Sequence, residues 1–165
     1  MSTKKPSSAS SVSVSEEAKA AYYLTFKMDL IKTELISRAD AIYRPSCGLD
    51  VRSVRVLRLI CEMPGITSSR LRSMTLIEKS TLSKLLAAML ERDLVRRTIN
   101  AEDSRYFNLW PTEAGHRLRA ETDKLASAME VEILWMLSTA EIAQLNHLVG
   151  KVMDSLFASA GPEAG

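Results

Sequence analysis

Short hydroxyl and cationic side chains gather at the start of a segment that is expected to be helical, 78–92. They are Lys79, Ser80, Thr81, Ser83 and Lys84. Hydroxyl groups can donate hydrogen bonds to base edges or accept them, and a lysine can reach a guanine or a phosphate. The same residues taken alone also fit a solvated helix start capped by hydroxyls. If the helix enters a DNA major groove, this is the end that would contact the bases.

Further phosphate-binding and groove-binding side chains flank this helix on both sides. Thr67, Ser68, Ser69 and Arg70 precede it, and Arg96, Arg97, Asp103 and Arg105 follow it. An arginine at a hairpin tip suits a narrow minor groove, where the potential is most negative, and the aspartate can hold its side chain in place. An exposed Asp–Arg pair alone contributes under about 1 kcal/mol. The order of hydroxyl-rich helix start, basic pair and arginine-tipped hairpin therefore indicates one interface for nucleic acid.

The elements that must hold these side chains follow from hydrophobic periodicity and turn signals. Helices are expected at 16–43, where Arg-Pro-Ser-Cys-Gly breaks the first one, then after an N-cap at Asp50, after an N-cap at Thr67, and at 78–92. The runs 94–99 and 106–110 predict a β-hairpin. A long helix at 112–137 and a last helix behind the capping box Ser138-x-x-Glu141 follow. A short helix, a turn, an amphipathic helix and a hairpin make a winged helix-turn-helix.

Two kinds of apolar surface are expected in this mainly α fold. The helix 78–92 has one apolar face that predicts burial in the core: Leu82, Leu85, Leu86, Met89 and Leu90. The last two helices carry more apolar surface than one small winged domain covers, which predicts a second chain, with an intramolecular helical hairpin as the alternative. Those side chains are Leu118, Leu125, Met129, Ile133, Met136 and Leu137, followed by Ile142, Leu145, Val149, Val152 and Met153.

Charge and composition narrow the class of protein. Residues 1–65 carry ten Lys/Arg against seven Asp/Glu, residues 66–105 eight against five, and residues 106–165 four against eight. Residues 1–105 therefore have a net charge of +6, and residues 106–165 have a net charge of −4. This asymmetry suggests that one region faces a polyanion. Two cysteines, no apolar run of about 18 residues and no signal-peptide pattern fit a cytoplasmic protein. The ends, 1–15 and 158–165, are expected to be flexible tails.

An enzyme is the first competing class. The sequence has no Gly-rich phosphate loop, Cys-x-x-Cys or His-Glu-x-x-His motif, and its two histidines, His116 and His147, lie far apart. No catalytic residue, cofactor or metal site is therefore expected. A winged-helix adaptor that binds proteins and not DNA is the second alternative.

The chain resembles the MarR (multiple antibiotic resistance regulator) family of bacterial transcription factors. The matching text runs from about residue 49 to 156, and its most specific parts are 80–97, Asp103-Ser-Arg105 and Thr112-Glu-Ala-Gly115. Four positions depart from the family pattern: Arg72, Glu78, Asp93, where the family often has glycine, and Pro111. Aspartate tolerates the left-handed conformation that such a glycine adopts.

The resemblance implies a homodimer that binds a pseudo-palindromic operator, with one recognition helix on each half-site. It divides the chain into an N-terminal dimerisation helix and linker at 16–48, a DNA-binding lobe at 49–111 and C-terminal dimerisation helices at 112–157. The function implied is that of a repressor released by a small aromatic or phenolic acid. Candidate effector-binding residues, which combine cations with aromatic and polar groups, are Arg38, Tyr43, Arg44, Arg55 and His116. A thiol redox sensor of the same fold, using Cys47 or Cys61, is an alternative.

Overall fold

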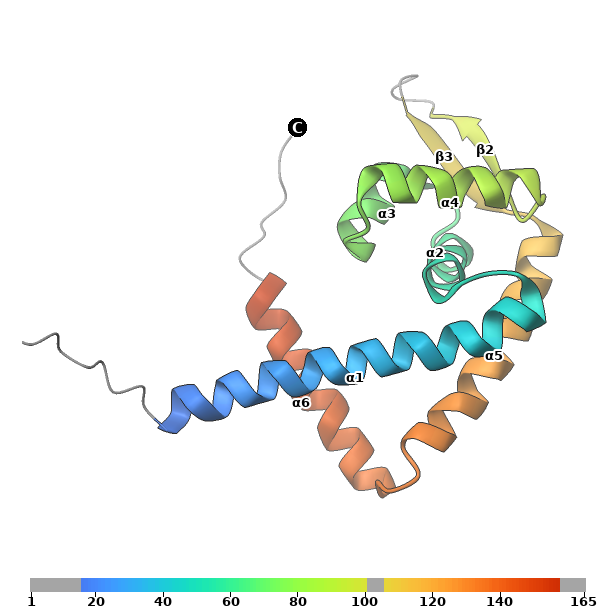
Figure 1. Ribbon diagram of the computed structural model, residues 1–165. Helices are drawn as coiled ribbons and strands as arrows, with labels where there is room; N and C mark the ends of the chain where they lie inside the picture. Colours follow the sequence, from blue (N-terminus) through green and yellow to red (C-terminus); the bar gives the residue numbers. More distant parts are fainter. Residues whose placement is uncertain (1–15, 101–105, 158–165) are drawn as a thin grey trace, which may run out of the picture.

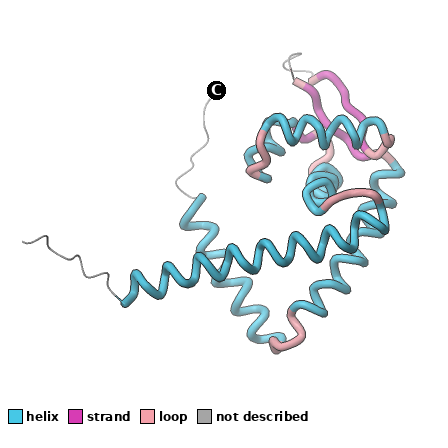
Figure 2. The backbone as a smooth tube through the Cα atoms, viewed as in Figure 1, coloured by secondary structure: helices cyan, strands magenta, loops and turns pink. Residues whose placement is uncertain are grey.

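The computed structural model describes the backbone of residues 16–100 and 106–157, and the side chains from residue 23 onward. The described chain is mainly helical with one small sheet, which confirms the expected fold class (Figure 1 and Figure 2). None of the helices in these ranges is long and apolar enough to cross a membrane. The elements are α1 Glu16–Cys47, α2 Val51–Glu62, β1 Ile66–Thr67, α3 Ser68–Thr75, α4 Lys79–Glu91, β2 Val95–Ile99, β3 Phe107–Pro111, α5 Glu113–Ile133 and α6 Thr139–Phe157.

Helix α2 forms the centre of a compact lobe. Figure 1 shows it end-on, with α1 on one side and α4 on the other. The side chain of Asp50 caps the helix by accepting a hydrogen bond from the backbone N–H of Ser53 at 2.8 Å, as the sequence predicted. Apolar residues of α2 are buried around most of its circumference because other elements surround it: Val51, Val54, Val56, Leu57, Ile60 and Cys61.

Helix α1 continues further than its sequence predicted. It contains Pro45 and ends at Cys47, so the expected break near residue 43 is wrong. A proline removes one backbone donor, but the terminal carbonyls still find a partner. The guanidinium of Arg92 donates to the carbonyl oxygens of Cys47 at 2.8 Å and of Gly48 at 3.4 Å. Gly48 then adopts a positive φ of 68°, which terminates the helix.

The sheet has three antiparallel strands in the order β1-β3-β2. The hairpin of β2 and β3 was predicted, and its register pairs Arg96 with Trp110 and Thr98 with Asn108. The two-residue strand β1 was not predicted, because a dipeptide has too few residues to show alternation. It pairs Ile66 with Leu109, and this joins the start of α3 to the hairpin.

Two non-glycine residues in the lobe adopt left-handed backbone conformations. Asp93, between α4 and β2, has φ 52°, which confirms that aspartate replaces the usual glycine in a left-handed turn. Leu76, which ends α3, has φ 54° although its side chain is 71% exposed. The left-handed conformation is unfavourable for leucine, so Leu76 is a strained residue in the α3–α4 turn.

Helices α5 and α6 leave the lobe and turn back on themselves (Figure 1). Thr112 caps α5 by accepting from the backbone N–H of Gly115 at 3.0 Å. The helix stops at Ile133 and not at residue 137, because residues 134–138 form a turn closed by a hydrogen bond between Leu137 N–H and the Leu134 carbonyl at 2.9 Å. The predicted capping box then opens α6, with Glu141 accepting from the Ser138 hydroxyl at 2.7 Å.

Candidate nucleic-acid interface

Helix α4 lies along the outer side of the lobe, on the opposite side of α2 from α1 (Figure 2). Its side chains Leu82, Leu86 and Met89 are buried, and Leu85 is half-buried, so the predicted apolar face does pack into the core. This packing fixes the rotation of the helix about its own axis. The opposite face of α4 is consequently directed away from the core.

The outward face of α4 consists of small and cationic residues. Ser80, Ser83, Lys84, Ala87 and Ala88 are exposed, whereas Thr81 is half-buried and faces a cavity beneath the helix. Ser83 and Lys84 make no hydrogen bond or ion pair with the described part of the chain. Their polar groups are therefore available to a partner, and the alanines beside them allow a close approach.

Ser80 differs from its neighbours because its hydroxyl already has a partner. The carboxylate of Glu78 accepts from the Ser80 hydroxyl at 2.6 Å and from the Ser80 backbone N–H at 2.7 Å. These hydrogen bonds hold the pKa of Glu78 below its ordinary value, and the bond from the Ser80 hydroxyl has the larger effect. Glu78 thus serves as the N-cap of α4. Ser80 can still accept a hydrogen bond, but its only hydroxyl proton is in use.

The first turn of α3 presents a second group of exposed side chains. Ser68, Ser69 and Arg70 are exposed, while Thr67 is half-buried because its hydroxyl caps the helix, accepting from the Arg70 backbone N–H at 3.2 Å. The sequence-predicted phosphate ligands therefore divide into one structural cap and three free side chains. Lys79, at the start of α4, is likewise exposed.

The two arginines of β2 lie on opposite faces of the sheet. Val95 is buried, and alternation along the strand places Arg97 on that same face and Arg96 on the other. The guanidinium of Arg96 lies over the ring of Trp110 at 5.5 Å from its centroid, and that of Arg97 over Phe107 at 4.7 Å. Cation–π contacts of this kind restrain the arginine side chains. The aromatic residues were not predicted as site residues. The hairpin register pairs Trp110 with Arg96 directly, whereas Phe107 is paired with Ile99 and lies diagonally from Arg97.

The predicted tip residues Asp103 and Arg105 lie outside the described residues. The base of the hairpin is described and is tied to α5. The Thr112 hydroxyl donates to the Asp93 carbonyl at 2.6 Å, and the Thr112 backbone N–H donates to the Leu94 carbonyl at 3.1 Å. A Cβ atom on Gly115 would lie 2.1 Å from that same Leu94 oxygen. The Thr-Glu-Ala-Gly motif therefore positions the base of the hairpin against α5.

A cavity of about 730 Å³ lies under the N-terminal end of α4, bounded by α1, α2 and the α3–α4 turn. Four cationic side chains line it: Lys32, Arg52, Arg55 and Arg58. Its apolar wall is made by Ile36, Leu59, Met74, Leu76 and Ile77. Among the described residues, Arg52 and Arg55 form no ion pair. The cavity thus combines unpaired positive charge with an apolar surface, and its volume suits a small molecule.

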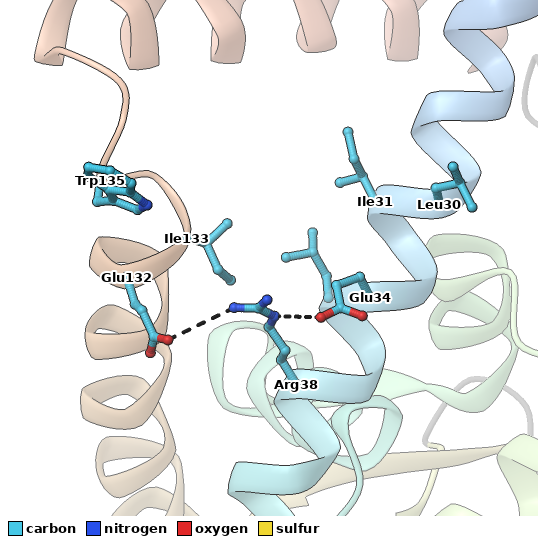
Figure 3. A pocket seen from close by; sticks show the side chains of 8 residues that line it. Leu30, Ile31, Glu34, Arg38, Glu132, Ile133 and Trp135 are labelled. Carbon is cyan, nitrogen blue, oxygen red and sulfur yellow. Dashed lines mark hydrogen bonds and ion pairs between the residues drawn. The ribbon is translucent and has the colours of Figure 1, made fainter.

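Of the five residues predicted to bind an effector, only Arg55 lines this cavity. Arg38 lies in a separate cleft of about 430 Å³ between α1 and the end of α5. Figure 3 shows its guanidinium between two carboxylates, 2.8 Å from Glu34 and 3.9 Å from Glu132. The hydrogen bond that Arg38 donates to Glu34 raises the pKa of Arg38 more than any other contact does. Because two carboxylates already surround Arg38, it is a poor receptor for another carboxylate.

The other three predicted effector residues lie elsewhere. Tyr43 is a core residue with 4% exposure, and burial raises its pKa. Arg44 pairs with Asp40 at 3.2 Å and Asp50 at 3.6 Å, where it supports the α1–α2 junction. His116 is exposed in the first turn of α5. These residues lie near helix junctions in the sequence, but the junctions are in different parts of the fold. The three side chains therefore do not form one site.

The two cysteines are free thiols. Cys61 is buried, and desolvation raises its pKa, which reduces the thiolate fraction that oxidation requires. Cys47 is half-buried, and its sulfur lies 3.1 Å from the Tyr43 carbonyl, within hydrogen-bonding reach. These environments do not favour the redox-sensor alternative. The described residues contain no group of three or more His, Cys, Asp or Glu side chains that could hold a metal ion.

A broad apolar surface extends over the helices outside the lobe. Within the described part of the chain, α6 buries none of its residues, and Leu145, Leu148, Val152 and Leu156 are 41–66% exposed. Trp135 and Met136 in the α5–α6 turn are 75% and 76% exposed. In contrast, Leu118, Leu125 and Met129 pack against the chain's own core. These three residues, which were predicted to lie in the seam, are half-buried where α5 packs against α1 and α2.

Comparison with known proteins identifies relatives of both the sequence and the fold. Residues 48–105 match the model of the MarR family. The transcriptional regulator HosA of Escherichia coli O127:H6 is 34% identical over 100 residues, which span 61% of this chain and 74% of HosA. The S. aureus MepR–DNA complex has a TM-score of 0.68 and 23% identity, covering 82% of this chain and 97% of MepR. A MarR protein from Peptoclostridium difficile has a TM-score of 0.76 and 19% identity, covering 82% and 88% of the two chains.

Proposed function

The chain belongs to the MarR family of transcriptional regulators, and from this premise we propose that it is a homodimeric repressor that binds double-stranded DNA at a pseudo-palindromic operator. The observation that carries this proposal is the outward face of α4, where Ser83 and Lys84 lie exposed beside two alanines and pair with none of the described residues. Solved relatives of this fold include DNA complexes of MepR and FabT. Membership in a family of transcriptional regulators also argues against the enzyme alternative.

The proposed contacts divide by role. Ser83 and Lys84 read base edges in the major groove, and Ser80 accepts a hydrogen bond there. Ser68, Ser69, Arg70 and Lys79 hold phosphates. Arg96 and Arg97 contact the DNA backbone from opposite faces of the hairpin. Arg105 enters the minor groove, and Asp103 holds the side chain of Arg105 in position. Thr67 acts only through its capping of α3.

The proposed partner in the dimer is a second copy of the chain, seated on α6 and on the cleft between α1 and α5. The apolar residues that line that cleft are Leu30, Ile31, Leu35, Ile133 and Trp135. Trp135 belongs to the turn before α6 (Figure 3). An apolar surface that continues across three helices is typical of a permanent interface. A two-fold axis would also give the two α4 helices the symmetry of a palindromic site.

The first experiment selects duplexes from a random library with the purified full-length protein. We expect a pseudo-palindrome to be enriched, and we expect Lys84→Ala to weaken binding to it. Loss of a base contact costs about 1–3 kcal/mol, whereas loss of a phosphate contact lowers the slope of log affinity against log salt by about 1. The matched control is Lys151→Ala, which removes the same charge from α6. Enrichment of no duplex at any salt concentration would favour the adaptor alternative.

The proposed effector is a small aromatic carboxylate bound in the cavity under α4. Arg52 and Arg55 supply the charge, and Met74, Leu76 and Ile77 supply an apolar wall for a ring. The cavity separates α1 from the α3–α4 turn, so a ligand that prefers a wider spacing shifts α4 away from its DNA-bound position. The exposed, strained Leu76 gains an apolar contact when a ring occupies the cavity.

Salicylate is a suitable probe of this site. We expect it to raise the melting temperature of the free protein, because a ligand of the native state stabilises it, and to release the selected duplex. Arg55→Gln should weaken salicylate binding about tenfold, as expected for loss of one charge-assisted hydrogen bond. Arg117→Gln, which removes an exposed charge from α5, should leave it unchanged. Equal affinities of the two variants would place the effector elsewhere.

A further inference from the structure

The carboxylate of Asp123 joins α5 to the DNA-binding lobe. Its Oδ1 accepts two hydrogen bonds from Arg58 of α2, from Nη2 at 2.7 Å and from Nε at 3.1 Å. Both side chains are little more than a third exposed, so solvent screens the pair only in part. Through this pair, α2 at the centre of the lobe is held to the helix that leads out of it.

Arg119, one turn earlier on α5, competes for the same carboxylate. Its Nε lies 3.1 Å from Oδ2 of Asp123, and its Nη2 lies 3.0 Å from Glu62 Oε1. Yet this Nε is buried and makes no properly oriented hydrogen bond with any described residue. An unsatisfied buried donor is costly. A modest rotation of Asp123 toward Arg119 would remove that cost.

Arg58 is also a wall of the cavity under α4. Arg58 therefore both binds the Asp123 carboxylate and borders the cavity. We propose that an anion in the cavity competes with Asp123 for Arg58, and that the released Asp123 pairs fully with Arg119, which frees the lobe from α5. This inference rests on the proposed function, because it assigns the regulation of the same cavity.

The exchange has the properties of a two-state switch. In one state Asp123 bridges α2 and α5, and the buried N–H of Arg119 lies near Asp123 Oδ2 without hydrogen-bond geometry. In the other state Asp123 pairs within α5, the Arg119 donor is satisfied, and the ligand carboxylate replaces Asp123 on Arg58. The number of charged pairs is conserved only when the ligand carboxylate is bound, because without it Arg58 has no carboxylate partner in the second state. The first state is therefore favoured in the ligand-free protein. The ligand favours the second state because only there is Arg58 free.

Two substitutions in the network should act in opposite directions on salicylate binding. Asp123→Asn removes the competitor for Arg58, so we expect the dissociation constant of salicylate to fall at least about fivefold, a typical coupling between sites. The affinity of the ligand-free protein for the selected duplex should fall by a similar factor, because the lobe is already released. Arg119→Gln removes the alternative partner of Asp123, so salicylate should bind at least about fivefold more weakly while duplex affinity changes less than about twofold.

The control is Glu121→Gln, which removes an exposed carboxylate from the same region of α5 and should change neither affinity. The coupling is overturned if Asp123→Asn and Arg119→Gln shift salicylate binding in the same direction, or if Asp123→Asn binds the duplex like wild type. Should salicylate neither bind the wild type nor release DNA, the proposed effector fails. Duplex affinities of the ligand-free Asp123→Asn and Glu121→Gln variants then still decide whether the Arg58–Asp123 pair positions the lobe.

Discussion

Replacing Val152 by aspartate is expected to separate the proposed dimer into monomers and to abolish tight operator binding. Val152 is 41% exposed on α6 and lies on the apolar stripe with Leu145, Val149 and Leu156. On the proposed interface the new carboxylate would be buried without a partner, at a cost of at least about 2 kcal/mol. A two-fold interface contains the substitution twice, so the dimer dissociation constant should rise about 1,000-fold.

The effect on DNA is indirect and larger than that of a single lost contact. Two linked recognition helices bind a palindrome with an avidity that exceeds the affinity of one by about 10²–10⁴-fold, and a monomer loses this factor. Sedimentation equilibrium gives the oligomeric state, and a gel shift on the selected duplex gives the affinity. The matched control is His147→Asp, which adds a carboxylate to the opposite face of α6. A Val152→Asp protein that remains dimeric would show that α6 is not the interface.

Replacing Gly115 by alanine is expected to have the largest effect on stability. The new Cβ would lie 2.1 Å from the Leu94 carbonyl oxygen and 3.2 Å from its carbon. Leu94 is 5% exposed, and its carbonyl is held by the Thr112 N–H at 3.1 Å, so the backbone has little freedom to withdraw. Overpacking of this kind costs about 3 kcal/mol or more, a large part of the 5–15 kcal/mol that stabilises a domain.

Urea denaturation followed by circular dichroism measures this loss, and a fall in melting temperature of about 6–12 °C should accompany it. Gly150→Ala is the matched control, because a Cβ there meets no atom of the chain within 4 Å. Alanine is the better helix former, so that variant should gain about 0.5–1 kcal/mol. Equal stabilities of the two variants would mean that the contact between α5 and the hairpin base relaxes freely.

The caps, the core face of α4 and the order of elements could all be predicted from the sequence, because each depends on residues within a few positions of one another. Asp50, Thr67 and Ser138 cap the helices for which they were proposed. Asp93 adopts the left-handed conformation that its position required. Local hydrogen bonds and helical periodicity fix these features whatever the rest of the chain does.

Contacts between distant segments could not be predicted from spacing. The sequence predicted that the first helix breaks before Pro45. In the structure the helix continues, and Arg92, far along the chain, donates hydrogen bonds to the carbonyl oxygens at its end. It placed Arg38 and Tyr43 in an effector site, and tertiary packing put one between carboxylates and the other in the core. The cavity lined by Arg55 and Arg58 arises only where α1, α2 and the α3–α4 turn meet.

The sequence by itself determined which face of α4 is polar, since 3.6-residue periodicity is a local property of the chain. Only the tertiary structure decided which of the polar residues outside α4 are free. Arg96 and Arg97 are stacked on rings across the hairpin, and Asp123 is shared between arginines of two helices. Partners separated by many residues meet only when the chain packs, and their distances then determine which charges remain available.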